Sequence, residues 1–418
     1  MGYTITVFGL GFVGLTTAIG FAEMGYKVYG IDLDTKRAND IKSGILPFEE
    51  PFLGEALKRN LGCNFVVQDN ILNCVDNSDF IFICVGTPSS ENGEADLKYI
   101  YNVLDNITPS LVSERYRIVV IKSTIPPGTT SNKIIPYLRS KGLPVGSKFS
   151  IANNPEFLRE GKCWEDFMYP DRIVCGVCDS KAENMLCQLY SCFDAPFYSV
   201  TLNTGEYIKY LSNTLLATMI SYSNEMSIIA DKIGDITIKD AFHILHMDKR
   251  WKNGSMASYV YPGCGYGGYC LPKDTIAMAK VSKNYGYNPQ ILNSVINVNG
   301  HMMDFFENKI KRISINKSTK IGILGLSFKP NSDDVRDSQA AKLISILVSD
   351  GYTNINGFDP IAIKPFKQMY QQYPVQYYDS MEELCNISEI IVVVTAWEEF
   401  RGIGLKYPEK KVIDGRYL

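Results

Sequence analysis

Short apolar runs alternate with helical patterns along the first part of the chain. Residues 5–8 predict a buried strand, and a helical pattern follows through Met24 until Gly25 ends it. Further strands are predicted over residues 27–31, 80–85 and 118–121. Apolar strands that alternate with helices indicate an α/β domain built on a parallel sheet.

A glycine-rich turn joins the first strand to its helix. Residues 9–14 read Gly-Leu-Gly-Phe-Val-Gly, a spacing that lets the backbone approach a pyrophosphate at the helix N-terminus. Asp32 ends the second strand about 20 residues beyond the glycines, where a carboxylate can bind ribose hydroxyls. That carboxylate would repel a 2′-phosphate, which favours NAD over NADP, although Lys36 and Arg37 could soften the repulsion.

Polar residues follow several of the predicted strands. Thr87 and Thr124 come after the strands over 80–85 and 118–121, and ligands of such sheets bind outside the carboxyl ends of the strands. Turn chemistry is the alternative for either threonine. Residues 154–161 carry Glu156 and Glu160 with an arginine between them, and their position after another apolar segment favours a polar site wall over a free surface loop.

One long helix is predicted over 204–233, with Thr204 or Asn203 as its cap. Lys209 and Asn213 lie four residues apart and therefore share a face, from which an ammonium and an amide could stabilise an oxyanion. An exposed polar stripe is the alternative interpretation. The largely apolar helix indicates a dimer or larger homo-oligomer, or else a domain core.

Residues 262–275 are rich in glycine and contain two cysteines. Pro272 is expected as the first residue of a helix that continues to Tyr285, which places Cys270 beside the helix N-terminus with Lys273 nearby. Both neighbours favour the thiolate, so Cys270 is the candidate nucleophile. Cys264 competes with it but has no helix terminus beside it. A buried, inert thiol is the alternative for both.

The last part of the chain repeats the strand and loop pattern. Residues 320–329 and 351–359 echo the first two strands and their glycines, which predicts a second Rossmann-like unit. Lys329 and Pro330 interrupt the glycine fingerprint, so this unit is expected to bind a nucleotide-diphosphate head group, with Lys329 and Arg336 as anion partners.

Composition narrows the class of protein. The 418 residues carry a net charge of -3, which argues against a nucleic-acid-binding surface. No apolar run approaches the ~20 residues of a membrane span, and the chain opens on a strand pattern rather than a signal peptide. Eleven cysteines favour reduced thiols and a cytoplasmic location. Cys175 and Cys178 are expected to be buried structural thiols, and His243 and His246 surface or core residues, so no metal site is expected.

Three segments taken together, residues 157–161, 265–274 and 328–338, closely resemble the UDP-glucose/GDP-mannose dehydrogenase family across essentially the whole chain. The resemblance implies two Rossmann-like doubly wound domains joined by a long central helix and a helical dimerisation segment. The implied division is an NAD-binding domain over 1–200, a central helical domain over 201–305 and a UDP-sugar-binding domain over 306–418. A homodimer or larger homo-oligomer is implied as well.

The resemblance also implies a role for each site residue. Cys270 is the thioester nucleophile, Lys209 and Asn213 stabilise oxyanions, Glu156 is an acid/base, and Thr124 with Asp274 holds the hydrolytic water. The cofactor contacts fall on Gly9, Gly11, Val13, Gly14, Asp32, Lys36, Thr87, Thr124, Glu160, Lys273 and Arg336. The substrate contacts fall on Glu156, Phe157, Leu158, Arg159, Lys209, Asn213, Tyr259, Tyr261, Gly263, Gly265, Tyr266, Gly267 and Lys329.

The implied reaction is a four-electron oxidation of a nucleotide sugar by NAD, through a thiohemiacetal and a thioester, as in UDP-glucuronate and polysaccharide biosynthesis. Residues 265–274 look most like those of enzymes acting on UDP-glucose, and Tyr269 argues against UDP-N-acetylmannosamine. GDP-mannose and UDP-N-acetylhexosamines stay open as substrates, as do a two-electron hydroxyacid dehydrogenase and a non-catalytic nucleotide-sugar binder. Residues 248–251 depart from the family pattern, which leaves Arg250 without an assigned role.

Overall fold

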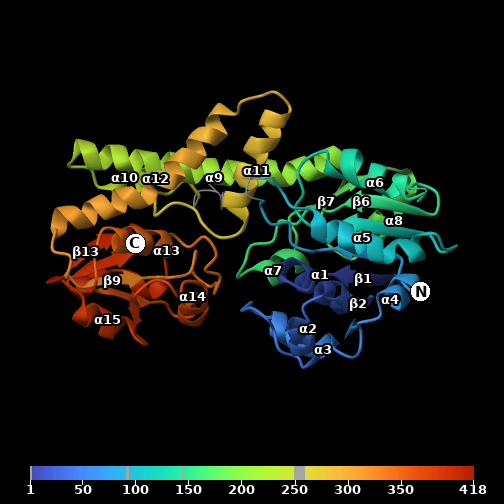
Figure 1. Cartoon of the computed structure of the whole chain (residues 1–418), viewed down its shortest axis with the longest axis horizontal. Helices are drawn as coiled ribbons and strands as arrows, with labels where there is room; N and C mark the ends of the chain where they lie inside the picture. The colour runs from blue at the N-terminus through green and yellow to red at the C-terminus, as the bar shows by residue number, and fades with distance from the viewer. Residues whose placement is uncertain (1, 91–93, 144, 249–258) are drawn as a thin grey trace. The chain divides into compact units, whose positions relative to one another are not determined.

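The computed structural model describes residues 2–90, 94–143, 145–248 and 259–418. The chain folds into two compact units, Met1–Leu211 and Ser212–Leu418. Helix α9 (Leu202–Ile233) begins in the first unit and continues into the second (Figure 1). Both units contain a sheet of mainly parallel strands with helices, which confirms the predicted α/β class with two Rossmann-like domains and a long central helix.

In the described part of the first unit, eight strands form one sheet in the order β3-β2-β1-β4-β5-β6-β7-β8. The first six follow the order of a Rossmann fold, and all neighbours are parallel except β6 and β7. Central strands such as β4 are buried on both faces, as their continuous apolar sequence requires. The bounds are β1 (Thr4–Phe8), β2 (Lys27–Ile31), β3 (Phe65–Val67), β4 (Phe80–Ile83), β5 (Arg117–Ile121), β6 (Phe149–Asn153), β7 (Ile173–Val177) and β8 (Phe197–Thr201).

Helices bury an apolar core on each face of this sheet. One core includes apolar side chains of α1, α2, α3, α7 and α8, and the other includes those of α4, α5 and α6. The helices are α1 (Phe12–Glu23), α2 (Thr35–Lys42), α3 (Leu53–Asn60), α4 (Ile71–Asp76), α5 (Lys98–Leu111), α6 (Ile135–Ser140), α7 (Cys163–Met168) and α8 (Ser180–Tyr190), with a π-helical turn, η1, over Thr130–Ile134.

Within the described residues of the second unit, five parallel strands form a sheet in the order β11-β10-β9-β12-β13. Its core lies against α12 and α13 on one face and α15 and α16 on the other. The strands are β9 (Ile321–Leu324), β10 (Ile355–Phe358), β11 (Val375–Tyr377), β12 (Ile390–Val393) and β13 (Lys411–Asp414). The helices after α9 are α10 (Ile238–His246), α11 (Cys270–Asn284), α12 (Gln290–Ile313), α13 (Gln339–Ser349), α14 (Ile363–Met369), α15 (Met381–Ile387) and α16 (Ile403–Lys406), with a 3₁₀ turn, η4, over Glu398–Phe400.

Two helices begin earlier than the sequence predicted. Helix α9 starts at Leu202, and the hydroxyl of Thr201, rather than Asn203 or Thr204, accepts from the Thr204 N–H at 3.2 Å. Helix α11 starts at Cys270 rather than Pro272. Proline fits the first helical turn because the N–H groups there have no intrahelical partner, so Pro272 did not have to be the first residue.

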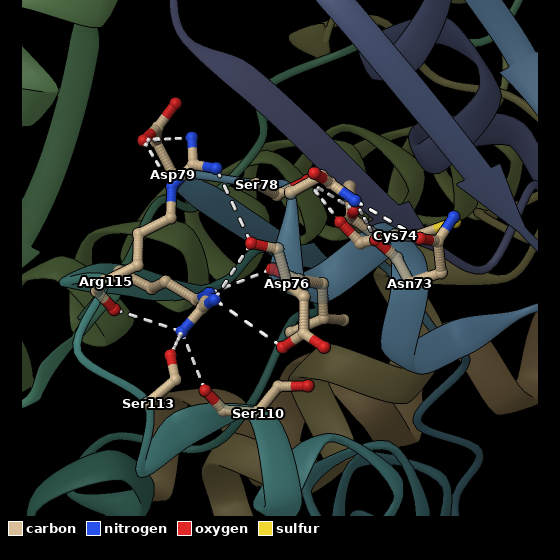
Figure 2. A network of polar contacts seen from close by, with 12 residues as sticks. Asn73, Cys74, Asp76, Ser78, Asp79, Ser110, Ser113 and Arg115 are labelled. Atoms are coloured by element: carbon tan, nitrogen blue, oxygen red, sulfur yellow. Dashed lines mark hydrogen bonds and ion pairs between the residues drawn. The ribbon is translucent and has the colours of Figure 1, made fainter.

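A buried arginine organises the amino ends of β4 and β5. Arg117 is 1% exposed, and its guanidinium donates to the carbonyls of Val75 at 2.8 Å, Ser110 at 2.7 Å and Asp76 at 3.0 Å. Figure 2 shows this network, in which the exposed Arg115 also pairs with Asp79 at 2.7 Å. The contacts join α4 and α5 at the amino ends of the strands. The candidate site lies at the opposite, carboxyl ends.

Candidate active site

The turn between β1 and α1 has the shape that a dinucleotide pyrophosphate needs. Gly9 has φ +85°, and a Cβ there would lie 2.9 Å from the Cys84 carbonyl oxygen. A Cβ at Gly14 would lie only 1.8 Å from the Gly9 carbonyl oxygen, so both positions require glycine. A Cβ at Gly11, the N-cap of α1, would meet nothing within 4 Å, and no side chain caps the helix. The open helix terminus therefore fits an anion.

Asp32 lies at the end of β2 and contacts this turn. Its Oδ2 accepts from the Leu10 N–H at 2.7 Å and pairs with Arg37 at 3.0 Å. The side chain of Lys36 is exposed, so Arg37 and not Lys36 is the cation at this carboxylate. The carboxylate lies beside the glycine turn, where a group that binds the ribose hydroxyls is expected.

The loops after β4 and β5 are joined to each other and to α9. The Thr87 hydroxyl donates to the Thr124 carbonyl at 2.8 Å, which brings the two predicted threonines together. The carboxylate of Glu206 on α9 accepts from the N–H groups of Gly128 at 2.6 Å, Thr129 at 3.1 Å and Thr130 at 2.8 Å. The role of Glu206 could not be predicted locally, because its partners lie 76–78 residues away in the chain.

The pair of Glu156 and Lys209 is buried in the first unit. The Lys209 ammonium lies 2.8 Å from Glu156 Oε1, and each side chain is 7% exposed. The other carboxylate oxygen accepts from the Leu158 N–H at 2.6 Å, which fixes the turn after β6. A buried acid and a buried ammonium in contact can exchange a proton or stabilise a developing negative charge.

Of the residues after Glu156, Phe157 is partly buried and Arg159 is exposed. Phe157 has the Arg172 guanidinium over its ring at 4.1 Å and the Lys209 ammonium at 5.8 Å. Arg159 is half exposed and pairs through Nη2 with Asp166 Oδ1 at 2.5 Å. Binding of a substrate phosphate by Arg159 would therefore have to compete with Asp166.

In the second unit, Cys270 is the first residue of α11, and its side chain is partly exposed. Cys264 lies in the preceding loop and is 2% exposed, and burial raises the pKa of its thiol to about 12. Because a nucleophilic cysteine must be both accessible and ionised, the structure supports Cys270 over Cys264.

Asp274 lies one helical turn after Cys270 and is 1% exposed. Its Oδ2 accepts from the Asn213 amide at 2.7 Å, and its Oδ1 lies 2.5 Å from the Lys273 ammonium. The structure thus brings together three of the predicted residues, Asn213, Lys273 and Asp274. Lys273 forms an ion pair with Asp274. A carboxylate held by an amide and an ammonium beside a cysteine can orient a water molecule for attack on a thioester.

The glycine-rich loop is held by residues that sequence analysis did not select. Asn299 accepts from the Tyr266 N–H at 2.8 Å, and Gln339 donates to the Tyr266 carbonyl at 2.6 Å. The Tyr269 ring has the Lys273 ammonium at 5.5 Å and the Arg336 guanidinium at 4.5 Å. Arg336 also pairs with Asp334 at 2.5 Å, so two cations and an aromatic ring adjoin the start of α11.

The remaining predicted substrate contacts lie in the same unit. Tyr261 donates to the Tyr417 carbonyl at 3.0 Å, and the Gly263 N–H donates to Asn224 at 2.7 Å. The Lys329 ammonium is 5.4 Å from the Phe328 ring centre. The others, Tyr259, Gly265 and Gly267, lie in the loop before α11, and Arg250 lies outside the described residues.

Two further predictions concern cysteine burial and metal binding. Cys175 is buried, but Cys178 is exposed at the end of β7, so the prediction of two buried thiols is wrong for Cys178. His243 is exposed, and His246 contacts the Val260 carbonyl at 2.8 Å. Among the residues that the structure describes, no three His, Cys, Asp or Glu side chains gather into a metal site.

Comparison with known families matches three consecutive regions of the chain to three domains of one family. Residues 3–194 match the NAD binding domain of the UDP-glucose/GDP-mannose dehydrogenase family, residues 203–301 match its central domain, and residues 322–418 match its UDP binding domain. The chain belongs to this family. NAD as the cofactor, predicted from the glycine turn and Asp32, is thereby confirmed.

Individual members of the UDP-glucose/GDP-mannose dehydrogenase family resemble the chain over nearly all of its length. A UDP-glucose 6-dehydrogenase of Rickettsia felis is 39% identical over 95% of this chain and 87% of its own. A UDP-glucose dehydrogenase structure from Pyrobaculum islandicum has a TM-score of 0.92 and 34% identity, covering 100% of this chain and 95% of its own. A UDP-D-ManNAc dehydrogenase structure from Pyrococcus horikoshii has a TM-score of 0.85 and 28% identity, covering 99% and 95%.

Proposed function

We propose that this chain is a UDP-glucose 6-dehydrogenase that oxidises UDP-glucose to UDP-glucuronate with two equivalents of NAD. The observation that carries the proposal is the start of α11, where an accessible Cys270 lies one turn before a buried Asp274 that Asn213 and Lys273 hold. A thiol is needed only where the aldehyde must be retained and oxidised again, so this arrangement favours four-electron chemistry. Relatives named UDP-glucose 6-dehydrogenase support the choice of sugar.

Bound NAD accepts the hydride in each of the two oxidations. Cys270 would add as a thiolate to the C6 aldehyde and form a thiohemiacetal, and loss of a second hydride from that carbon would leave a thioester on the same sulfur. Water would then attack the thioester carbon, and the carbon–sulfur bond would break to release the uronate and the Cys270 thiolate. The balance is one sugar nucleotide, two NAD⁺ and one water giving one uronate, two NADH and three protons.

The other site residues would stabilise charge, transfer protons or hold water, NAD and the substrate. Lys209 and Asn213 would stabilise the oxyanions, and Glu156, held by Lys209 at 2.8 Å, would transfer protons. Asp274 and Thr124 would orient the hydrolytic water. The turn over residues 9–14, Asp32, Lys36, Thr87, Glu160, Lys273 and Arg336 would hold NAD, while residues 157–159, 259–267 and Lys329 would hold the nucleotide sugar.

The proposal extends to assembly, domains and location. Helix α9 exposes four apolar side chains in the second unit, those of Leu215, Tyr222, Ile229 and Ile233. These side chains support a homodimer or larger homo-oligomer. The proposed division is 1–200 for NAD, 201–305 for dimerisation and 306–418 for the UDP-sugar. The eleven free cysteines support a cytoplasmic site of action in polysaccharide biosynthesis. No helix in the described ranges is long and apolar enough to cross a bilayer.

The test is the yield of NADH per mole of sugar nucleotide, measured to completion with limiting substrate. UDP-glucose, GDP-mannose and UDP-N-acetylmannosamine are compared with the purified protein. About two NADH per UDP-glucose, with little from the others, is the expected result. About one NADH from any sugar would overturn the thioester mechanism, and about two from another sugar alone would overturn the choice of UDP-glucose.

A further inference from the structure

Arg172 is a partly buried arginine that the proposed mechanism does not use. It directly precedes β7 (Ile173–Val177). Because β7 runs antiparallel to β6, the amino end of β7 lies beside the carboxyl end of β6. The chain continues from that end of β6 to Glu156. Arg172 therefore lies at the edge of the sheet that carries the candidate site, although it comes before a strand and not after one.

The register of β6 and β7 brings Arg172 to Phe157. Asn153 pairs with Gly176, and the same register continued beyond the strand ends places Phe157 opposite Arg172. The Arg172 guanidinium lies over the Phe157 ring, 4.1 Å from its centre, and the Lys209 ammonium is 5.8 Å from the same centre. A cation over a ring face is attracted to it, so the contact restrains the guanidinium.

Arg172 differs from the neighbouring cations in its partners. Lys209 is paired with Glu156 at 2.8 Å. Arg159 is paired with Asp166, through Nε at 3.0 Å and Nη2 at 2.5 Å. Within the part of the chain that the structure describes, no hydrogen bond or ion pair is made by the guanidinium of Arg172, and its contact is the Phe157 ring. Of these cations, Arg172 is the one whose charge no described carboxylate compensates.

The chemistry of a guanidinium indicates which ligand would suit this position. Its N–H donors lie in one plane, so a ring below that plane leaves them free to bind an acceptor at the edge. The planar fork matches a phosphate, to which it can donate two parallel hydrogen bonds. A sugar nucleotide carries a diphosphate, and Phe157 belongs to the segment proposed to hold it. The diphosphate of NAD has a separate place at the open amino end of α1.

We propose that Arg172 binds the diphosphate of the sugar nucleotide, with the Phe157 ring holding its guanidinium in place. This inference rests on the proposed function and adds a substrate-binding residue to it. Arg172 would supply the phosphate contact that Arg159 could make only by giving up Asp166. The face of the guanidinium would then contact the ring, and its edge would contact the ligand.

The experiment compares ligands with and without phosphate groups. Calorimetry measures the affinities of uridine, UMP, UDP and NAD for the wild type, Arg172→Gln and Arg172→Lys. Removing the phosphates from the ligand and the guanidinium from the protein forms a thermodynamic cycle, which isolates the contact between them.

Lys181→Gln is the matched control. The Lys181 ammonium lies 3.4 Å from the centre of the Tyr116 ring, and Tyr116 precedes β5 at the amino ends of the strands, away from the candidate site. This variant therefore also loses one positive charge and one cation–ring contact. A general effect of net charge on anion binding would appear in it as well.

Arg172→Gln is expected to weaken UDP binding by about 30-fold and UMP binding by less, with uridine and NAD changed by less than about twofold. Arg172→Lys keeps the charge but not the fork, so its affinity for UDP should fall between those of the wild type and Arg172→Gln. In Lys181→Gln all four affinities should stay within about twofold of the wild type. The KM for UDP-glucose should rise with the loss of UDP affinity, while kcat changes by less than about threefold.

Three results would overturn the inference. Equal losses for uridine and UDP would show that Arg172 only shapes the segment around Phe157. An unchanged affinity for UDP would show that it makes no phosphate contact, and a loss confined to NAD would assign the guanidinium to the cofactor. If Arg172→Gln does not fold, as judged by thermal melting, the ratio of UDP to uridine affinity in Arg172→Lys decides the same question.

Failure of the proposed function is a separate result. A wild type that binds UDP but does not yield about two NADH per UDP-glucose would overturn the four-electron oxidation. The comparison of UDP with uridine involves no turnover, so it would still decide whether Arg172 binds the diphosphate.

Discussion

The Asn213 amide donates to Asp274 Oδ2 at 2.7 Å, and both side chains are buried. The hydrogen bond joins α9 to α11 and leaves Asp274 Oδ1 for the Lys273 ammonium at 2.5 Å. The carboxylate is therefore oriented before any substrate binds. In the proposed mechanism, such preorganisation would lower the reorganisation needed to activate a water molecule beside the thioester.

Asp274→Asn should slow hydrolysis of the thioester more than its formation. The amide cannot take a proton from water, so turnover should fall by about 10²-fold or more while the oxidations still occur. Rapid mixing with excess NAD and UDP-glucose should show a burst of about two NADH per active site, and intact mass spectrometry should detect the UDP-glucuronyl thioester on Cys270. A loss of the burst equal to the loss of turnover would contradict this role.

Cys270→Ala should abolish oxidation of UDP-glucose to the uronate while retaining UDP-glucose binding, as measured by calorimetry. The matched control is Cys264→Ala, in the same loop. Because Cys264 is 2% exposed and its pKa is raised to about 12, its removal should reduce stability by about 1 kcal/mol and leave the NADH yield unchanged. Retained uronate formation in Cys270→Ala would contradict the assignment.

Asp32→Ser should weaken the preference for NAD over NADP. The substitution removes the carboxylate that would repel a 2′-phosphate, and it releases Arg37, which pairs with Asp32 at 3.0 Å, to bind that phosphate. The ratio of kcat/KM for NAD to that for NADP should fall by about 10²-fold. The double variant Asp32→Ser with Arg37→Ala is the control, and it should recover little NADP activity.

The sequence predicted local features of the fold and site better than features that depend on distant partners. The glycines over 9–14, Asp32 at the end of β2 and the alternation of strands and helices are local patterns, and each lies where it was predicted. Glu206 was not selected, because its partners are 76–78 residues away in the chain. The start of α11 was placed two residues late, because proline fits more than one position of a first turn.

Glu206 gives a test of stability against pH. Burial raises the pKa of its carboxyl above the ordinary 4.5, although three backbone N–H groups act in the opposite direction. The folded state therefore binds the proton more tightly than the unfolded state, and this contribution to stability is complete below pH 4.5 and is lost as pH rises through the folded pKa. Glu206→Gln does not titrate. The destabilisation that it causes, measured by urea unfolding, should thus be larger at about pH 5 than at about pH 8, and the opposite trend would contradict the burial effect.

Arg117 and Arg115 form a matched pair for measuring what a buried guanidinium contributes to stability. Arg117→Met should lower the free energy of unfolding by about 3 kcal/mol, because the buried carbonyls of Val75 and Ser110 lose the guanidinium and keep only backbone N–H donors. Arg115→Met removes an ion pair whose arginine is 41% exposed, so it should cost about 0.5 kcal/mol or less. Both losses can be measured by urea unfolding at one pH. This network lies at the amino ends of the strands, away from the candidate site, so kcat should be unchanged in folded Arg117→Met. Equal losses of unfolding free energy in the two variants would show that burial of Arg117 adds nothing to stability.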